Sequence, residues 1–303
     1  MRCFWEGLVL LLLWTAVAAD AREYRPVVLM HGVTSDRSSM DTLAGWLADK
    51  YPGIYVKNVE IGNGWIDSLF WSMNDQCADF AEQLLADPKL ARGFSMVGHS
   101  QGGLVTRCAL ERYPLKVYNY VSLAGPNAGQ YGVPSFNAMC PDAQCPWLVE
   151  LFDLVLTGGW TDPLVQDHLS FASYWKDPLD YPAYLKYSTF LPDLNNERPE
   201  KNATYRERVL AVNTMMLVHS TTDIIIIPRT SPWFWFYAED SISGIVPVQQ
   251  TAQWTEDWLG LRALYERGGL RFEAVNCSHN DLPETPCRWA FDTLYGDLLG
   301  TFL

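Results

Sequence analysis

The hexapeptide Gly98-His99-Ser100-Gln101-Gly102-Gly103 stands between an apolar run at 94–97 and an amphipathic segment at 104–113. The first segment is typical of a buried strand and the second of a helix, so the serine falls on a tight strand-to-helix turn. Such a turn strains the backbone of its central residue and needs small residues two positions before and after it. Gly98 and Gly102 meet this requirement. The stretch therefore predicts an exposed serine hydroxyl at a helix N-terminus.

The segments around this turn alternate between two patterns. Short apolar runs predict strands at 26–30, 55–61, 93–97, 118–124, 214–218 and 271–275. Apolar residues at helical spacing predict helices at 40–47, 77–85, 104–113, 254–264 and 286–299. Strands that alternate with helices build βαβ units. The sequence therefore predicts an α/β fold with a mostly parallel, doubly wound sheet.

One long segment, 126–208, breaks the alternation because it is rich in proline and aromatic residues. We interpret it as a helical cap inserted into the sheet. No Pro-, Gly- or Ser-rich linker separates the two halves of the chain. Residues 20–303 are therefore predicted to form one domain that carries this insertion.

The N-terminus has the pattern of a secretory signal peptide. Arg2 precedes an uncharged, leucine-rich stretch at 7–19 that ends in the small residues of a cleavage site. This stretch is shorter than the roughly 20 residues of a comfortable membrane span, and no second apolar run approaches that length. A signal anchor is the alternative. We expect residues 1–19 to be removed and the mature chain to be soluble and lumenal, without a stable membrane span.

The charge of the chain excludes one class of partner. Its 303 residues include 35 acidic and 22 basic ones, which gives a formal net charge of −13. Such a chain repels phosphate backbones at neutral pH, so a nucleic acid is not expected as a partner. The cysteines and histidines show no CxxC or HxxxH spacing, so neither a metal nor another cofactor is predicted.

The cysteines agree with an oxidising compartment. Of the seven, Cys3 lies in the predicted signal peptide, and the others are Cys77, Cys108, Cys140, Cys145, Cys277 and Cys287. An even number in a lumenal protein favours disulfides. Short spacing favours Cys140 with Cys145 and Cys277 with Cys287, which leaves Cys77 with Cys108, although six cysteines allow about 15 connectivities. Two sequons, at Asn202 and Asn276, predict N-glycosylation and point to the same compartment.

A serine hydroxyl is a poor nucleophile unless a histidine accepts its proton and a carboxylate orients that histidine. After a turn of this kind, the acid and then the histidine follow along the chain. Of the five histidines, His279 comes after a predicted strand, where such a base is expected. Asp223 follows the preceding strand, and Glu239 and Asp240 are rivals farther along. Ser100, Asp223 and His279 are the predicted catalytic residues.

The transition state of acyl transfer carries a negative oxygen, which backbone N–H groups stabilise. One N–H is expected from Gln101, the residue after the serine. The other is expected from the loop after the first strand, where Gly32 allows a close approach and Val33 offers its N–H. Thr34 is the alternative to Val33. The predicted oxyanion hole is thus made of main-chain groups.

Together these motifs resemble the palmitoyl-protein thioesterases, a family of lysosomal α/β-hydrolases that cleave fatty acyl thioesters. Besides the Ser100 turn, the resemblance rests on His31-Gly32, Gly125-Pro126-Asn127-Ala128-Gly129-Gln130-Tyr131-Gly132, Phe190-Leu191-Pro192-Asp193-Leu194-Asn195-Asn196-Glu197 and Pro232-Trp233-Phe234-Trp235-Phe236-Tyr237. It covers most of the mature chain, and its Gly-Gln-Tyr-Gly stretch looks more like the second lysosomal member of the family than the first. Two features depart from the family pattern: Trp235 replaces a glycine, and four isoleucines follow Asp223.

The resemblance implies an α/β-hydrolase fold with Ser100, Asp223 and His279 as the catalytic triad and Val33 and Gln101 at the oxyanion positions. It implies a lysosomal thioesterase that hydrolyses long-chain fatty acyl (palmitoyl) thioesters through an acyl-enzyme. The expected partners are S-acylated proteins or peptides and acyl-coenzyme A, in the lysosomal lumen or after secretion. A lipase or carboxylesterase with the same triad is the alternative. A non-catalytic lipid-binding protein is the third hypothesis.

A palmitoyl chain needs a long apolar channel, because each buried CH₂ group contributes up to about 0.8 kcal/mol. The inserted segment is the predicted source of this channel. Trp147, Leu151 and Phe152 recur there at near-helical spacing and are predicted to bind the substrate. The alternative is that this apolar face only seals the insertion onto the sheet.

Overall fold

The computed structural model describes residues 23–139 and 145–303, and its centre is a six-stranded sheet. The strands lie in the order β2-β1-β3-β4-β5-β8, and each neighbouring pair is parallel. Their bounds are β1 Val27–Met30, β2 Val56–Val59, β3 Phe94–His99, β4 Val117–Leu123, β5 Thr214–Ser220 and β8 Leu270–Val275. Each overlaps a run that was expected to be a strand. The predicted α/β class with its mostly parallel sheet is therefore confirmed.

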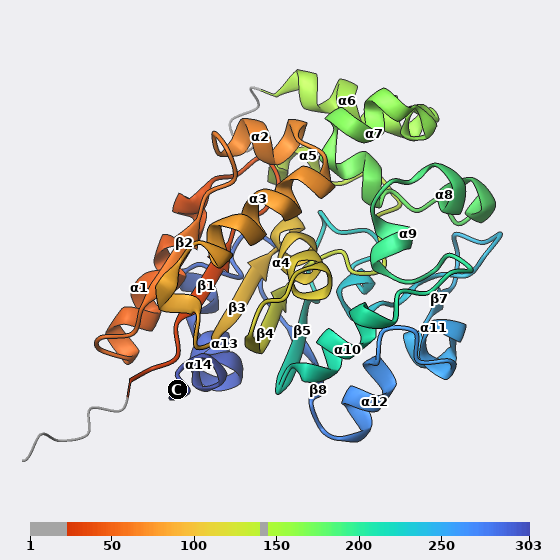
Figure 1. The fold of residues 1–303 in the computed structure, drawn as a ribbon. Coiled ribbons are helices and arrows are strands. Elements are labelled where there is room, and N and C mark those ends of the chain that lie inside the picture. Colours follow the sequence, from red (N-terminus) through yellow and green to blue (C-terminus); the bar gives the residue numbers. More distant parts are fainter. Residues whose placement is uncertain (1–22, 140–144) are drawn as a thin grey trace, which may run out of the picture.

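Helices cover both faces of this sheet (Figure 1). Successive side chains of a strand point to opposite faces. In β1, Val27 and Leu29 belong to one buried cluster, whereas Val28 and Met30 belong to the other. The first cluster includes side chains of α1 (Asp41–Lys50), α13 (Arg288–Ala290) and α14 (Gly296–Leu299), and the second includes those of α3 (Met73–Leu85) and α4 (Gln101–Arg112).

The strand order reverses once, between β1 and β3. From β1 the chain moves outward to β2 and then returns to the other side of β1, where β3, β4, β5 and β8 follow in turn. The connections that leave β1 and β3 pass over opposite faces, through α1 and α4. Ligands of open parallel sheets bind at the carboxyl ends of the strands at such a point. The loops after β1 and β3 are therefore where a site is expected.

The described residues between β4 and β5 form a series of helices, of which α6 and α7 lie at the top of the view in Figure 1. The predicted cap, 126–208, spans this series as far as the middle of α10. Phe152 of α6 shares a buried cluster with Leu104 of α4, so the insertion and the sheet have one core. The bounds are α5 Phe136–Met139, α6 Pro146–Leu156, α7 Pro163–His168, α8 Tyr181–Tyr187, α9 Leu191–Leu194 and α10 Ala203–Ala211. That this segment acts as a cap remains a prediction.

One helix has no counterpart among the sequence expectations. Helix α2 (Trp65–Phe70) leaves Trp65, Ile66 and Phe70 exposed, so its apolar residues do not mark a single buried face. Periodicity identifies a helix by such a face. This is why the sequence pattern missed α2.

The helices in the C-terminal part of the chain are shorter and more often interrupted than predicted. The predicted helix at 254–264 is two short helices, α11 (Ala252–Thr255) and α12 (Leu261–Glu266), because Asp257 and Gly260 between them have φ values of +55° and +77°. The predicted helix at 286–299 consists of α13, a π-helical turn and α14. Between β5 and α11, the short strands β6 (Phe236–Tyr237) and β7 (Ile245–Val246) pair in antiparallel fashion.

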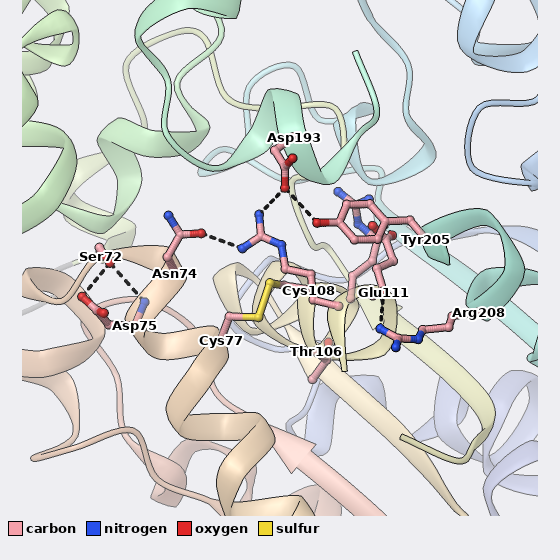
Figure 2. Close-up of a disulfide and its surroundings, with 12 residues drawn as sticks. Ser72, Asn74, Asp75, Cys77, Thr106, Cys108, Glu111, Asp193, Tyr205 and Arg208 are labelled. Carbon is pink, nitrogen blue, oxygen red and sulfur yellow. Dashed lines mark hydrogen bonds and ion pairs between the residues drawn. A yellow bond between two sulfur atoms is a disulfide. The ribbon is translucent and has the colours of Figure 1, made fainter. Parts of the chain in front are cut away.

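Two disulfides are present in the described part of the chain. Cys77 pairs with Cys108 and joins α3 to α4, as Figure 2 shows. Cys277 pairs with Cys287 and closes the loop after β8. The pairing of Cys277 with Cys287 is as predicted from short spacing, and that of Cys77 with Cys108 is as predicted for the remaining pair. The third predicted pair, Cys140 with Cys145, cannot be placed because Cys140 lies outside the described residues, as does the predicted signal peptide at 1–19.

The described residues show neither a membrane-spanning helix nor a cluster of metal ligands. None of the helices in 23–139 and 145–303 is long and apolar enough to cross a bilayer. Within the same ranges, no three side chains of His, Cys, Asp or Glu gather in a group that could hold a metal ion.

Candidate active site

Ser100 lies on the turn between β3 and α4, with a φ of +55° and a ψ of −130°. A positive φ is uncommon for a residue with a side chain, so the surrounding structure must hold this conformation. The neighbouring glycines leave the space that the turn needs. A Cβ on Gly98 would collide with the carbonyl of Gly102, and a Cβ on Gly102 would collide with that of His31. Ser100 therefore stands at the N-terminus of α4, where its hydroxyl can face a ligand.

Asp223 and His279 come from different loops and meet at hydrogen-bond distance. Asp223 follows β5 and His279 follows β8, and these strands are neighbours in the sheet. The Nδ1–H of His279 donates to Oδ2 of Asp223 over 2.7 Å, and both side chains are buried. A carboxylate at Nδ1 fixes the tautomer in which Nε2 is free to accept a proton.

The carboxylate of Asp223 is held in its charged form. Its Oδ1 accepts the backbone N–H groups of Ile225 and Ile226 over 2.8 and 2.9 Å. Burial alone would raise the pKa of Asp223, but His279 and these two N–H groups hold it below its ordinary value of 3.8. The isoleucine run thus positions the acid through its backbone.

Ser100 and His279 line the same cavity, which has a volume of about 190 Å³. It lies at the carboxyl ends of β1 and β3, where the strand order reverses. The other lining residues are Gly32, Val33, Thr34, Ser35, Ser39, His99, Met139, Ile225, Asn280, Pro283 and Glu284. The predicted nucleophile and base therefore share an open space that a reacting group could enter.

The predicted oxyanion donors belong to the two segments that meet at Ser100. Gln101 is the first residue of α4, so no helical hydrogen bond uses its N–H. Val33 and its alternative, Thr34, both line the cavity. A Cβ on Gly32 would lie 2.9 Å from the Cβ of Ser100, so glycine is needed for the loop to come this close.

The side chain of Gln101 connects the site to three other parts of the molecule. Its Nε2 donates to the carbonyl of Ser68 over 2.7 Å and to Oε1 of Gln76 over 3.0 Å. The hydroxyl of Tyr174, in the inserted segment, donates to Oε1 of Gln101 over 3.0 Å. The residue with the predicted oxyanion N–H is therefore anchored to α2, to α3 and to the insertion.

His99 is a site residue that the sequence reasoning missed. Its Nε2–H donates to the backbone carbonyl of His279 over 2.9 Å. Burial lowers the pKa of His99 to about 3, and the neighbouring His279 adds to this effect. His99 is therefore neutral at physiological pH and can keep this hydrogen bond.

Other predicted site residues lie elsewhere. Trp147, Leu151 and Phe152 do not line the cavity at Ser100. The Trp147 ring is 6.1 Å from that of Trp65, and Phe152 stacks on Phe171 with ring centroids 4.1 Å apart. Leu151 packs partly buried against the core. Of the rival acids, Glu239 lines a separate cavity beside Phe236.

Both asparagines of the predicted sequons are exposed. Asn202 precedes α10, and its side-chain oxygen accepts the N–H of Thr204 over 3.1 Å. Asn276 follows β8, and Cys277 within its sequon is buried in a disulfide. Occupancy by a glycan stays a prediction at both positions.

A parallel sheet in this order, a serine on the β3–α4 turn and loops after β5 and β8 that bring an acid and a histidine together define the α/β-hydrolase class of enzymes. The family model for palmitoyl protein thioesterase matches residues 26–279. The chain therefore belongs to this family, as the sequence motifs predict, and it is a hydrolase.

Three relatives support this membership. Palmitoyl-protein thioesterase 3 of Dictyostelium discoideum is 46% identical over 90% of this chain and 91% of its own. Palmitoyl-protein thioesterase 1 of Caenorhabditis elegans is 31% identical over 94% of this chain and 96% of its own. The lysosomal thioesterase PPT2 homolog of Drosophila melanogaster is 32% identical over 89% of this chain and 90% of its own.

Proposed function

We propose that this chain hydrolyses long-chain fatty acyl (palmitoyl) thioesters of proteins or coenzyme A through a Ser-His-Asp acyl-enzyme mechanism. The observation that carries the proposal is the 2.7 Å contact between His279 and Asp223 at the wall of the cavity that Ser100 lines. Membership in the palmitoyl protein thioesterase family supports the choice of substrate.

The mechanism begins when Oγ of Ser100 attacks the thioester carbonyl and Nε2 of His279 takes the hydroxyl proton. Asp223 stabilises the imidazolium through Nδ1–H. The C–S bond then breaks, the thiolate leaves with the proton from His279, and the acyl group stays on Ser100. A water molecule, activated by His279, hydrolyses this ester and restores the free serine.

The N–H groups of Gln101 and Val33 would stabilise the negative oxygen of both tetrahedral intermediates. The loss of one such donor typically costs about 2.7–4 kcal/mol in the barrier. A thiolate is a better leaving group than an amine, so we expect most of the barrier reduction to come from these two donors rather than from protonation of the leaving group.

We propose that the acyl chain runs toward the inserted segment, the cap at 126–208, and that Trp147, Leu151 and Phe152 line its path. The cavity at Ser100 is about 190 Å³, which is below the roughly 300–1,000 Å³ of sites that enclose a small ligand. A palmitoyl chain therefore needs further space. Helix α6 is a candidate to line that space because most of its residues are apolar.

We infer a lysosomal lumen location, after removal of a signal peptide at 1–19. A Drosophila relative that is named a lysosomal thioesterase supports this, as do the two disulfides. Exposed Asn202 and Asn276 are compatible with N-glycosylation in the same pathway.

One experiment separates this proposal from its alternatives. Purified protein is offered palmitoyl-coenzyme A and a palmitoyl glycerol ester at matched concentrations, with Ser100→Ala as control. A thioesterase cleaves the first much faster, whereas faster cleavage of the glycerol ester would indicate a lipase or carboxylesterase. If neither substrate turns over and a serine-directed fluorophosphonate fails to label Ser100, the chain is a non-catalytic lipid-binding protein.

A further inference from the structure

A buried histidine that the mechanism above does not use contacts the loop that carries Val33. His31 is fully buried at the end of β1. Its Nδ1 lies 2.9 Å from the carbonyl oxygen of Gly32, and its Nε2 lies 2.9 Å from Oε1 of Glu60, which follows β2. Both ring nitrogens of His31 therefore face oxygen atoms.

The carbonyl that His31 contacts belongs to the peptide unit of the predicted oxyanion donor. A peptide unit is planar and trans, so its C=O and N–H point in opposite directions. The unit between Gly32 and Val33 has the contacted carbonyl at one end and the N–H of Val33 at the other. When His31 fixes the carbonyl, it also fixes the direction of this N–H at the cavity of Ser100.

His31 can donate hydrogen bonds to both the Gly32 carbonyl and Glu60 only when the His31–Glu60 pair carries an additional proton. A carbonyl oxygen only accepts hydrogen bonds, so Nδ1 of His31 must carry a proton. A neutral ring would then turn the lone pair of Nε2 toward the carboxylate of Glu60. Nε2 of His31 lies 2.9 Å from Oε1 of Glu60, so a second proton on the ring would place an imidazolium N–H opposite the carboxylate.

Burial and the groups around His31 set the pH at which its proton is lost. Burial lowers the pKa of His31 below 6.5, and the Gly32 carbonyl, Glu60 and Asp36 offset this only in part. The backbone N–H of Arg37 donates to Oε2 of Glu60 over 3.1 Å, and the Arg37 cation acts on Asp36. His99, at the end of β3, is uncharged there. The imidazolium is thus present in acid and lost as the pH rises toward neutral.

We propose that the His31–Glu60 pair is a proton-dependent latch that orients the oxyanion peptide and makes the enzyme competent at acidic pH. This proposal rests on the function proposed above. His31 and Glu60 are positioning residues, because neither lines the cavity at Ser100. When the pair loses its proton to solvent, the Gly32 carbonyl is held less firmly and the transition state is stabilised less.

Glu60→Gln tests the latch. The amide oxygen can keep the N–H of Arg37, while the amide N–H₂ donates to Nε2 of a neutral His31, so the latch no longer needs its extra proton. We measure kcat and KM for palmitoyl-coenzyme A at about pH 5 and about pH 7.5. From about pH 5 to about pH 7.5 the wild-type kcat should fall about tenfold or more, while KM should change little. The fall should not exceed the roughly 10²–10³-fold loss that is typical when one oxyanion donor is removed. The variant should keep its kcat within about twofold.

Two further variants complete the design. Glu60→Ala removes the partner and should lower kcat already at about pH 5, by about tenfold, without restoring it at about pH 7.5. Glu82→Gln makes the same chemical change at an exposed position of α3 and should match wild type throughout. Melting temperatures confirm that each variant is folded.

The outcomes distinguish the latch from the proposed function. A wild type that hydrolyses the thioester while Glu60→Gln keeps the wild-type pH profile would overturn the latch alone. The same holds if Glu60→Ala behaves like Glu60→Gln. A wild type that shows no turnover at about pH 5, with Ser100 unlabelled by a fluorophosphonate, would overturn the proposed function and the latch with it.

Discussion

At the scale of single residues, the candidate site is held mainly by backbone groups. The N–H groups of Ile225 and Ile226 hold Asp223, and the carbonyl of His279 is held by His99. Only a few side chains would therefore react, and each depends on the conformation of the backbone near it. We expect severe effects from substitutions of these side chains and smaller effects from substitutions of the residues that hold the backbone.

Asp223→Asn should lower kcat on the order of 10⁴-fold, because an amide at this position favours the imidazole tautomer that cannot accept the proton of Ser100. The measurement is kcat for palmitoyl-coenzyme A near the pH optimum. Asp240→Asn is the matched control, since it makes the same change in a rival acid, and asparagine tolerates its φ of +57°. Should the control lose activity while Asp223→Asn keeps it, the acid has been assigned to the wrong residue.

His99→Phe should lower kcat by roughly two- to tenfold, which corresponds to the loss of one hydrogen bond of about 0.5–1.5 kcal/mol to the His279 carbonyl. Because the pKa of His99 is about 3, the shape of the pH profile above about pH 4 should not change. The control is His168→Phe, at an exposed position of α7. Wild-type kcat in His99→Phe would show that this contact does not position the base.

The sequence could predict Ser100, Asp223 and His279 because each follows a recognisable apolar strand. It could not predict the contact of His99, whose acceptor lies 180 residues farther along the chain. His31 was used only as part of a familiar dipeptide, because Glu60 becomes its neighbour only through the pairing of β1 with β2. Local patterns therefore point to candidate reacting groups but not to the groups that would orient them.

At the scale of elements, α3 and α4 are joined by Cys77–Cys108, with Asn74 and Asp193 nearby in Figure 2. Replacing both cysteines by serine should lower the free energy of unfolding by about 2–4 kcal/mol, as expected for a loop of this size. Chemical denaturation with and without a reducing agent measures the effect. A reducing agent should destabilise wild type more than the double variant, and equal sensitivity would contradict a stabilising role for this bridge.

Helix α6 offers a test of the acyl channel. Leu151→Ala should weaken turnover of palmitoyl more than butyryl thioesters, since each CH₂ that loses its contact costs up to about 0.8 kcal/mol. Val149→Ala on the same helix is exposed and serves as control. Phe152 is less suitable, because it stacks on Phe171 and its loss would disturb packing. Equal losses for both chain lengths would mean that α6 is structural.

At the scale of the whole molecule, a buried ion pair lies where the sheet domain meets the insertion. Arg107 of α4 contacts Glu111 over 3.0 Å and Oδ1 of Asn195, from the inserted segment, over 2.7 Å. Burial raises the pKa of Glu111 to about 7, although Arg107 opposes the shift. A raised pKa means that the folded state binds the proton more tightly than the unfolded state. The resulting stabilisation is complete below the ordinary pKa of 4.5 and is lost as the pH rises through about 7.

The free energy of unfolding of the wild type should fall from about pH 5 to about pH 7.5. In Glu111→Gln this fall should be smaller by roughly 1–3 kcal/mol. The free energy of unfolding is measured at both pH values in wild type and variant. Glu207→Gln, at an exposed position of α10, is the control and should leave the difference unchanged. An unchanged difference in Glu111→Gln as well would show that other groups govern the pH dependence.

The bridge between Cys277 and Cys287 closes the segment in which His279 lies. In a compartment that keeps thiols reduced, this segment has no covalent closure, and the base loses one of its constraints. We therefore expect the reduced chain to be a poorer catalyst than the oxidised one. Acyl thioesters in a compartment that keeps thiols reduced would then be protected from the enzyme by its redox state, without a separate inhibitor.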